Sequence, residues 1–275
     1  MSDNQQQIDY WNGAAGATWV EAQARLDAML EPLSARAIAK AEPGPGMRVI
    51  DVGCGCGATS LALAARGAHV WGVDISAPML ALAEQRAQGL EQVKFSIADA
   101  AYQPLSSDHD LIFSRFGVMF FADPVAAFAN LHSGLRAMGR LVFLCWQAPR
   151  LNPWISVGGA AIAPFLPESE TPDPKAPGPF AFADSSYLQA ILQQAGFTDI
   201  TMDALNVDLN VGENLDVAMD FQTQVGPASR AIAELDGADK SRALAAARAA
   251  LAPYETPDGV ILGSATWLVS ATAGH

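Results

Sequence analysis

Cysteine, histidine and basic side chains are all scarce in this chain, and each shortage argues against a class of function. Its 275 residues include three cysteines and four histidines, and 16 basic side chains against 29 acidic ones give a formal net charge of −13. A surface this acidic repels phosphate backbones and anionic lipids, so we expect neither nucleic acid nor a membrane as partner. The N-terminus lacks the basic and apolar regions of a signal peptide, and no uncharged apolar run is long enough to span a bilayer. We therefore expect a cytoplasmic location.

The three cysteines do not form a recognisable metal motif. Cys54 and Cys56 flank a glycine, and Cys145 lies in an apolar run. A Cys-x-Cys pair with no further cysteine or histidine nearby is a poor zinc signal. No metal-ligand spacing and no Ser/His/Asp arrangement is visible elsewhere in the sequence. We therefore predict no metal site and three reduced thiols, and we assign no catalytic residue.

A glycine-rich stretch at residues 48–59, RVIDVGCGCGAT, is the strongest signal that the chain does contain. A short apolar run with Asp51 leads into Gly53, Gly55 and Gly57 and then into a helix-forming run, which are the parts of a nucleotide-binding turn. Glycine permits positive φ and a close approach of the backbone to a ligand. The spacing is G-x-G-x-G, whereas dinucleotide-binding turns usually need G-x-G-x-x-G. An acid before the glycines also suits a cationic ligand better than a pyrophosphate, which points to S-adenosylmethionine.

The next predicted strand ends in a second acid. Residues 69–73 read as a strand that leads into Asp74, 17 residues beyond Gly57. An acid at the end of the second strand is placed to accept hydrogen bonds from both ribose hydroxyls. Ser76 and Pro78 then read as a helix N-cap and a first-turn proline.

Together with SRFGVMFFADP at residues 114–124 and GRLVF at 139–143, these motifs resemble the class I S-adenosylmethionine-dependent methyltransferases. Within that class the chain is similar to the small-molecule enzymes related to ubiquinone and menaquinone methyltransferases. The resemblance implies a small-molecule acceptor. It also implies that Asp99 accepts from the adenine amino group while the N–H of Ala100 meets the ring. The predicted cofactor-binding residues follow the strand ends or come from the N-terminal segment: Asp51, Gly53, Cys54, Gly55, Gly57, Asp74, Ile75, Asp99, Ala100, Ser114, Tyr10 and Trp11.

The N-terminal segment has two interpretations. From Thr18 onward apolar residues recur at spacings of three and four, which predicts an amphipathic helix. The segment either packs on the edge of the sheet or forms a flap across the cofactor. In the second case Tyr10 and Trp11 lie near the sulfonium, because aromatic faces attract cations.

Residues just after the fourth predicted strand lie at the carboxyl edge of the sheet, where α/β proteins bind ligands. Arg115 there either recognises an acidic acceptor or pairs with a structural acid and shapes the wall. The segment 147–183 is rich in proline and aromatic residues, and we predict that it is a loop on the acceptor side. The predicted substrate-binding residues are Arg115, Phe116, Met119, Trp146 and Trp154.

Seven predicted strands alternate with helices, which indicates a doubly wound α/β fold. The resemblance adds a Rossmann-like strand order, with a final antiparallel strand between the fifth and the sixth. We predict a single methyltransferase domain over residues 1–275. Its predicted parts are an N-terminal helical flap over 1–46 and a cofactor-binding core over 47–146. Residues 1–9 of the flap are predicted to be a mobile tail. Inserts over 147–183 and 213–257 follow strands five and six and form the acceptor side.

The predicted reaction is S-adenosylmethionine-dependent methyl transfer to an O, N or C atom of a small, ring-bearing molecule. The acceptor attacks in line, and catalysis comes mainly from holding the reactants together, an effect of up to roughly 7–11 kcal/mol. Two alternatives stay open. A nicotinamide-dependent oxidoreductase shares the first strand, the glycine turn and Asp74, and a cofactor-binding protein without transferase activity shows the same motifs. The acceptor's identity and the oligomeric state do not follow from the sequence.

Overall fold

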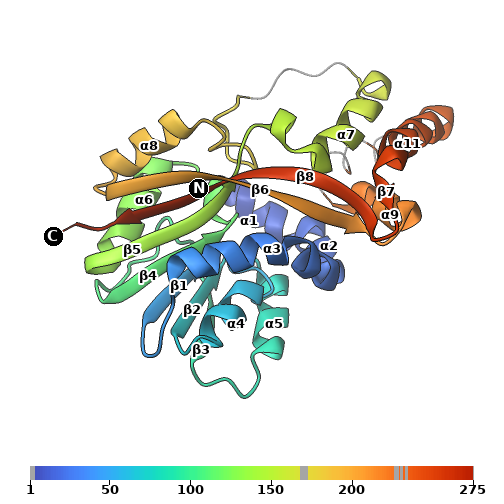
Figure 1. Cartoon of the computed structure of the whole chain (residues 1–275). Helices are drawn as coiled ribbons and strands as arrows, with labels where there is room; N and C mark the ends of the chain where they lie inside the picture. Colours follow the sequence, from blue (N-terminus) through green and yellow to red (C-terminus); the bar gives the residue numbers. More distant parts are fainter. Residues whose placement is uncertain (1–3, 168–172, 226–228, 230–231, 233–234, 275) are drawn as a thin grey trace. The chain divides into compact units, whose positions relative to one another are not determined.

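The computed structural model describes residues 4–167, 173–225, 229, 232 and 235–274, and it has an α/β architecture (Figure 1). Contacts divide the chain into two compact units. The first unit comprises Met1–Trp146, Pro174–Leu205 and Thr266–His275, and the second comprises Gln147–Asp173 and Asn206–Ala265. The predicted cofactor-binding core, residues 47–146, lies in the first unit. The arrangement as a single domain stays a prediction.

The first unit is built on a sheet with the strand order β3-β2-β1-β4-β5-β8-β6. The strands are β1 (Arg48–Val52), β2 (His69–Asp74), β3 (Val93–Ile97), β4 (His109–Arg115), β5 (Leu135–Trp146), β6 (Thr198–Gly212) and β8 (Gly259–Thr272). The first five pair in parallel, and β8 is antiparallel to β5. This confirms the doubly wound sheet with a final antiparallel strand between strands five and six. One further strand, the two-residue β7 (Glu255–Thr256), pairs with β8 and was not predicted.

The core of the first unit lies along the central strands. Leu111, Ile112 and Phe113 of β4 and residues 141–144 of β5 are fully buried. Such continuous apolar runs are typical of parallel strands that are covered on both faces.

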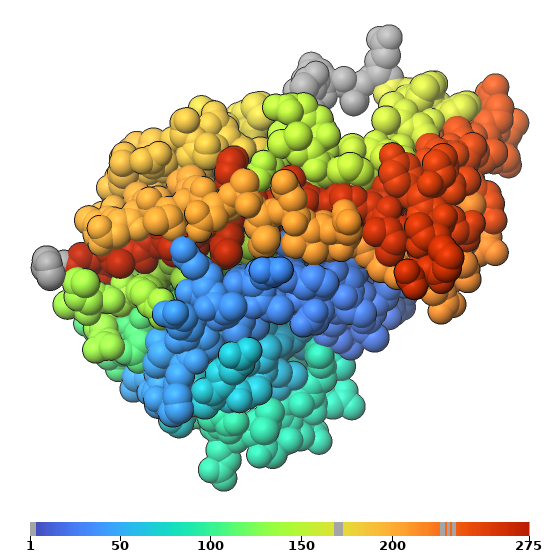
Figure 2. All heavy atoms as spheres, in the orientation of Figure 1, coloured from blue at the N-terminus to red at the C-terminus, as the bar shows by residue number. Residues whose placement is uncertain are grey.

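Helices cover the two faces of this sheet (Figure 1). The helices of the first unit are α1 (Gln5–Asn12), α2 (Ala14–Glu21), α3 (Gln23–Ala41), α4 (Ala58–Ala64), α5 (Ala77–Arg86), the 3₁₀ turn η1 (Val118–Phe120), α6 (Pro124–Ser133) and α8 (Ser185–Gln194). Helix α3 contacts β4, β5 and α4, and α6 packs with β5 and α8. In the space-filling view the blue N-terminal helices pack directly against the cyan segment that carries α4 and α5 (Figure 2).

Two acids cap helices as local sequence rules predict. Asp123 accepts from the backbone N–H of Ala126 at the start of α6, and Asp184 accepts from two backbone N–H groups at the start of α8. Ser76 does stand at the N-cap of α5, but its side chain makes no capping hydrogen bond there.

The prediction of a mobile tail over residues 1–9 is wrong for the residues that the structure describes, because α1 begins at Gln5. The helix predicted from Thr18 is also not continuous, since α2 ends at Glu21 and α3 begins at Gln23. The first error has a physical cause: α1 is held by hydrogen bonds from Asn4 and Asn12 to distant loops, which periodicity does not report.

The second unit is mainly helical. It holds η2 (Pro149–Leu151), α7 (Pro153–Ile162), η3 (Ala163–Phe165), α9 (Leu215–Gln224), α11 (Gly237–Leu251), η4 (Ala252–Tyr254) and β7, together with parts of β6 and β8. Helix α7 packs against α11, which also contacts α9. The segment 147–183 is therefore not the uniform loop that we predicted. Pro153 opens α7 at its first turn, where the missing N–H of proline costs nothing.

Candidate functional site

The glycine turn follows β1 and is fixed to the end of β2. Gly53, Gly55 and Gly57 have φ values of 65°, 55° and 82°, in the left-handed region that favours glycine. The backbone N–H groups of Gly53 and Cys54 both donate to the carbonyl oxygen of Val73, at 2.9 and 3.2 Å. The predicted strand–turn–helix unit is therefore formed, and its backbone conformation depends on glycine.

The turn also lies against the backbone that follows β4. A Cβ added to Gly53 would stand 2.6 Å from the Cα of Gly117, and one added to Gly117 would stand 2.5 Å from the carbonyl oxygen of Val52. Ser114 is fully buried and links the same elements, because its hydroxyl donates to Val52 O at 2.8 Å and accepts from the N–H of Gly117 at 3.2 Å. The end of β4 thus sets the course of the turn.

Asp51 lies beneath the turn and is fully buried. Its Oδ2 accepts from the hydroxyls of Thr59 and Ser60 at 2.7 and 2.6 Å, and its Oδ1 has no hydrogen-bond partner among the described residues. Burial raises the pKa of Asp51 to about 6; the Ser60 and Thr59 hydroxyls and the charge of Arg115 oppose this rise. The site therefore contains a buried acceptor that a cation would satisfy.

This buried acid predicts a specific pH dependence of folding. The folded-state pKa of Asp51, about 6, exceeds the ordinary value of 3.8, so its contribution to stability is present at low pH and is lost as the pH rises through about 6. By linkage, Asp51→Asn should gain about 2 kcal/mol of unfolding free energy relative to wild type between about pH 4 and about pH 7. Urea unfolding at several pH values measures this difference.

The control variant, Asp108→Asn, should change the pH dependence of stability in the opposite direction. The Ser106 hydroxyl lowers the pKa of the exposed Asp108, so the contribution of Asp108 is lost as the pH falls. Asp108→Asn should therefore show no gain with rising pH. If the stability curves of Asp51→Asn and wild type run parallel, Asp51 is not titrating as its burial implies.

Asp74 stands at the end of β2 and is half-buried. One carboxylate oxygen accepts from the N–H of Gly55 at 2.8 Å, and the other accepts from the N–H of Ser76 at 2.9 Å. Burial raises the pKa of Asp74, and these backbone N–H groups counteract it. The side chain thereby connects the glycine turn to the start of α5, and its partial exposure leaves it accessible to a ligand such as ribose.

Asp99 follows β3 and is also half-buried. Its Oδ1 accepts from the N–H of Ala101 at 3.0 Å, and its Oδ2 accepts from the side-chain amide of Asn4 at 2.6 Å. The adjacent Ala100 is buried, and its carbonyl oxygen accepts from Asn130. Asp74 ends β2 and Asp99 follows β3, so the two predicted acids both stand at the carboxyl edge of the sheet, beside strands that pair with each other.

Cys54 is buried in the turn. A Cβ added to Gly72 of β2 would come within 3.0 Å of its sulfur, so the thiol is directed toward β2. Burial raises the pKa of all three thiols, Cys54, Cys56 and Cys145, and that of Cys56 reaches about 11. All three are free thiols. A cofactor contact by Cys54 stays a prediction.

Helix α1 is attached to the loops that follow the strands. Asn12 donates to the carbonyl oxygen of Ile75 at 2.8 Å and accepts from the N–H of Ala77 at 2.9 Å. The Ser76 hydroxyl, which makes no capping hydrogen bond to α5, donates to the carbonyl oxygen of Trp11 at 2.7 Å. Helix α3 packs on the central strands β4 and β5, and α1 is hydrogen-bonded to the loop that follows β2. A flap of this segment across the cofactor stays a prediction.

The aromatic residues of α1 form a small cluster. The Trp11 ring makes edge contacts with Tyr10, Trp19 and Phe120, with ring centroids 5.0, 5.7 and 5.4 Å apart. Phe120 belongs to η1, which follows β4, so the cluster connects α1 to a third loop. Proximity of Tyr10 and Trp11 to a bound sulfonium stays a prediction.

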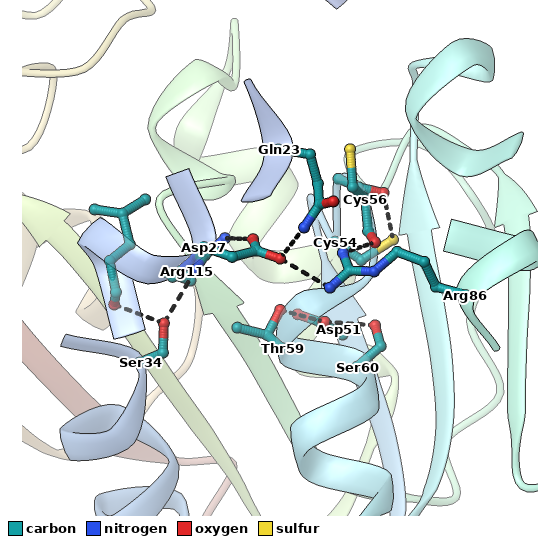
Figure 3. Close-up of polar contacts among 12 residues, drawn as sticks. Gln23, Asp27, Ser34, Asp51, Cys54, Cys56, Thr59, Ser60, Arg86 and Arg115 are labelled. Atoms are coloured by element: carbon teal, nitrogen blue, oxygen red, sulfur yellow. Dashed lines mark hydrogen bonds and ion pairs between the residues drawn. The ribbon is translucent and has the colours of Figure 1, made fainter. Parts of the chain in front are cut away.

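Arg115, at the end of β4, is directed toward α3 (Figure 3). Its guanidinium donates to the hydroxyl of Ser34 at 3.1 Å and lies 4.0 Å from a carboxylate oxygen of Asp27. The other oxygen of Asp27 pairs with Arg86 at 2.8 Å, and Arg86 also donates to the carbonyl oxygen of Cys56 at 2.6 Å. With a side chain only 12% exposed, Arg115 takes part in a structural network, as the second interpretation of this residue expected.

Phe116 follows at once and has an unusual backbone conformation. Its φ is 64°, a left-handed value that bulky residues rarely adopt. Its ring stacks on Trp146 at the end of β5, with centroids 4.1 Å apart and planes 5° apart. Met119 is buried close by in sequence, and its carbonyl oxygen accepts from Gly178. Of these predicted substrate-binding residues, Trp146 ends β5, Phe116 directly follows β4, and Met119 lies in η1.

Trp154 belongs to the second unit. It is buried there at the start of α7, where its ring N–H donates to Asn152 at 3.2 Å and its carbonyl oxygen accepts from Gln222 at 2.8 Å. Its role toward an acceptor stays a prediction.

These residues fit S-adenosylmethionine. The free Oδ1 of buried Asp51 suits a cationic donor, and Asp74 and Asp99 offer carboxylates at the ends of adjacent strands. A Cβ added to Gly55 would meet only the flexible end of Met79, at 3.0 Å, so the middle of the turn is otherwise open. When bound, this cofactor supplies an electrophilic methyl group on a sulfonium.

Several contributors were missed from the sequence, notably Asn4, Asn12, Asp27 and Arg86. One signal was present for α1, since Asn12-Gly13 is a helix-ending dipeptide and separates α1 from α2. The ion-pair network carried no such signal. Across the described residues, no group of three or more His, Cys, Asp and Glu side chains could hold a metal ion. In the same part of the chain, no helix has both the length and the apolarity to cross a membrane.

Known proteins are similar to this chain in sequence and in fold. A family described as methyltransferase domain matches residues 49–139. The chain is 30% identical over 184 residues to demethylmenaquinone methyltransferase of Clavibacter sepedonicus, across 63% of this chain and 74% of that protein. It is 32% identical over 185 residues to the protein of the same name from Thermus thermophilus, across 59% and 80%.

A solved structure has the same fold. Haemonchus contortus phosphoethanolamine N-methyltransferase 2, in complex with phosphomonomethylethanolamine and S-adenosylhomocysteine, gives a TM-score of 0.55 at 17% identity, across 89% of this chain and 53% of that chain. None of these findings favours the oxidoreductase alternative. The strand order, the glycine turn and the relatives agree, and the chain belongs to the class I S-adenosylmethionine-dependent methyltransferases of small-molecule type.

Proposed function

We propose that this methyltransferase acts on an O, N or C atom of a small, ring-bearing molecule. The observation that carries the proposal is the stacked pair of Phe116 and Trp146 at the carboxyl ends of neighbouring strands. Ligands of doubly wound proteins bind at this edge. Aromatic rings favour other rings through offset stacking and edge contacts.

The strained backbone of Phe116 supports the same proposal. Residues held in sparsely populated conformations cost about 1–3 kcal/mol and cluster at functional sites. Here the next residue, Gly117, lies against the glycine turn, so the strained residue directly precedes backbone that contacts this turn. A less constrained residue at this place would avoid the strain but would not offer an aromatic face.

The names of two relatives agree with a ring-bearing acceptor, since demethylmenaquinone carries a quinone ring. The net charge of −13 disfavours large polyanions such as nucleic acid. Arg115 gives little support to an acidic acceptor, because its guanidinium already contacts Ser34 and approaches Asp27. We assign no general base; the protein's contribution is to hold the acceptor close and in line, an effect of up to roughly 7–11 kcal/mol.

The proposal is tested with S-adenosylmethionine that carries a trideuterated methyl group. Purified enzyme is incubated with reduced quinones, naphthols and phenols in one arm, and with aliphatic amines and nucleic acid in others. We expect the mass label on a ring-bearing acceptor, and less of it with Phe116→Leu, which keeps an apolar side chain but removes the ring. Transfer only to the aliphatic amines would contradict the proposal.

A further inference from the structure

The first turn of α1 contains an asparagine in an unusual environment. Asn4 occupies the N-cap of α1, yet its side chain makes no capping hydrogen bond. Asparagine is among the preferred N-cap residues because its side-chain oxygen accepts from the helix backbone. Only 5% of Asn4 is exposed, and its Nδ2 lies 2.6 Å from Oδ2 of Asp99 instead. The side chain is thus withdrawn from its own helix and directed at Asp99.

The chemistry of Asp99 fixes the orientation of this amide. An ionised carboxylate only accepts hydrogen bonds, so the NH₂ group of Asn4 must face it. The Oδ1 of Asn4 is then left as an acceptor. It is buried and has no partner among the described residues. A buried acceptor without a donor costs free energy, so this atom is suited to a ligand that brings an N–H group.

A second acceptor of the same kind lies one helical turn later. Oε1 of Gln7 is likewise buried and without a partner among the described residues. Residues three apart on a helix are neighbours on its surface. Asn4 therefore places one amide oxygen beside Asp99, and Gln7 adds a second buried amide oxygen one turn further along α1.

We propose that Asn4 is a specificity residue for the purine, which selects a 6-amino group through its Oδ1 beside the carboxylate of Asp99. The proposal rests on the role of Asp99 toward the adenine that is part of the proposed cofactor site. An exocyclic amino group carries two N–H donors, one for each of two acceptors. A 6-oxo purine carries an oxygen on C6 in place of the amino group. This oxygen accepts hydrogen bonds, but here it would face only other acceptors.

The test compares two ligands, S-adenosylhomocysteine and its 6-oxo analogue S-inosylhomocysteine, by calorimetry. The wild-type protein should prefer the 6-amino compound. Asn4→Ala should reduce the ratio of the two affinities by about tenfold, the effect of one lost hydrogen bond in a buried site. Gln6→Ala, an exposed residue of the same helix, should leave the ratio unchanged.

Ser76→Ala separates recognition from simple attachment of α1. The Ser76 hydroxyl also holds α1, through the carbonyl oxygen of Trp11, and it makes no contact with Asp99 in the structure. Its loss should weaken both ligands equally and leave their ratio intact. If Asn4→Ala behaves in the same way, or leaves both affinities unchanged, the specificity role is overturned while the cofactor site stands. If wild-type protein binds neither compound, the cofactor site itself is overturned, and with it the proposal.

Discussion

Asp74→Ala is expected to weaken the binding of S-adenosylhomocysteine by ten-fold or more. A hydrogen bond to an ionised group contributes roughly 1.5–3 kcal/mol, which corresponds to about 10- to 150-fold in affinity. The effect should lie toward the upper end, because Asp74 also holds the N–H of Gly55 at 2.8 Å. Removing the carboxylate therefore removes a ligand contact and releases the middle of the glycine turn. Calorimetric titration measures the change.

Asp184→Ala is the matched control. Asp184 also accepts from two backbone N–H groups at a helix start, but on α8. Its loss should lower stability by about 1 kcal/mol, the usual effect of losing an N-cap, and leave the affinity unchanged. Asp74→Asn, which keeps one acceptor oxygen, should fall between wild type and Asp74→Ala. Unaltered binding by Asp74→Ala would remove this residue from the cofactor site.

Gly53→Ala is expected to destabilise the protein strongly, by about 3 kcal/mol or more. Two effects combine: the left-handed φ of 65° is unfavourable for alanine, and the new Cβ would stand 2.6 Å from backbone that belongs to Gly117. The close contact joins two backbone segments, so no flexible side chain could move to relieve it. The displaced turn should also bind S-adenosylhomocysteine at least tenfold more weakly, by the same hydrogen-bond estimate.

Gly89→Ala and Gly117→Ala separate the two effects. Gly89 has a φ of 84° with nothing within 4 Å of an added Cβ, so its variant reports strain alone, about 1–2 kcal/mol. Gly117 has an ordinary φ of −82° but would clash with Val52 O, so its variant reports the close approach alone. Chemical denaturation gives all three values. Equal losses in Gly53→Ala and Gly89→Ala would refute the close contact between turn and β4.

The parts of the site that could be predicted depend on local rules. Left-handed glycines and an acid at a strand end each act within a few residues, so the sequence indicates Gly55 and Asp74. The antiparallel β8 came from family resemblance, since periodicity carries no strand order.

The missed parts depend on contacts between distant segments. The run QQQID at residues 5–9 has no apolar face, so nothing local predicts a helix there. Its attachment comes from Asn4 and Asn12, whose partners lie 95 and 63 residues away. Asp27 similarly meets Arg86 from 59 residues away. In the second unit, proline reads as a loop signal in the sequence, although Pro153 stands where a helix tolerates it.

The contact between Asn4 and Asp99 has a practical consequence for handling the protein. An affinity tag fused close before Asn4 would stand next to a residue whose side-chain amide donates to Asp99. The carboxyl end follows Thr272, which pairs with Arg140, whereas Trp146 of the same strand pairs with Thr266. A tag after Thr272 therefore extends from beside Arg140 of β5, away from Trp146 at the carboxyl end of that strand. Purification handles, surface immobilisation and fluorescent labels therefore belong at the carboxyl end, where they leave the first turn of α1 unmodified.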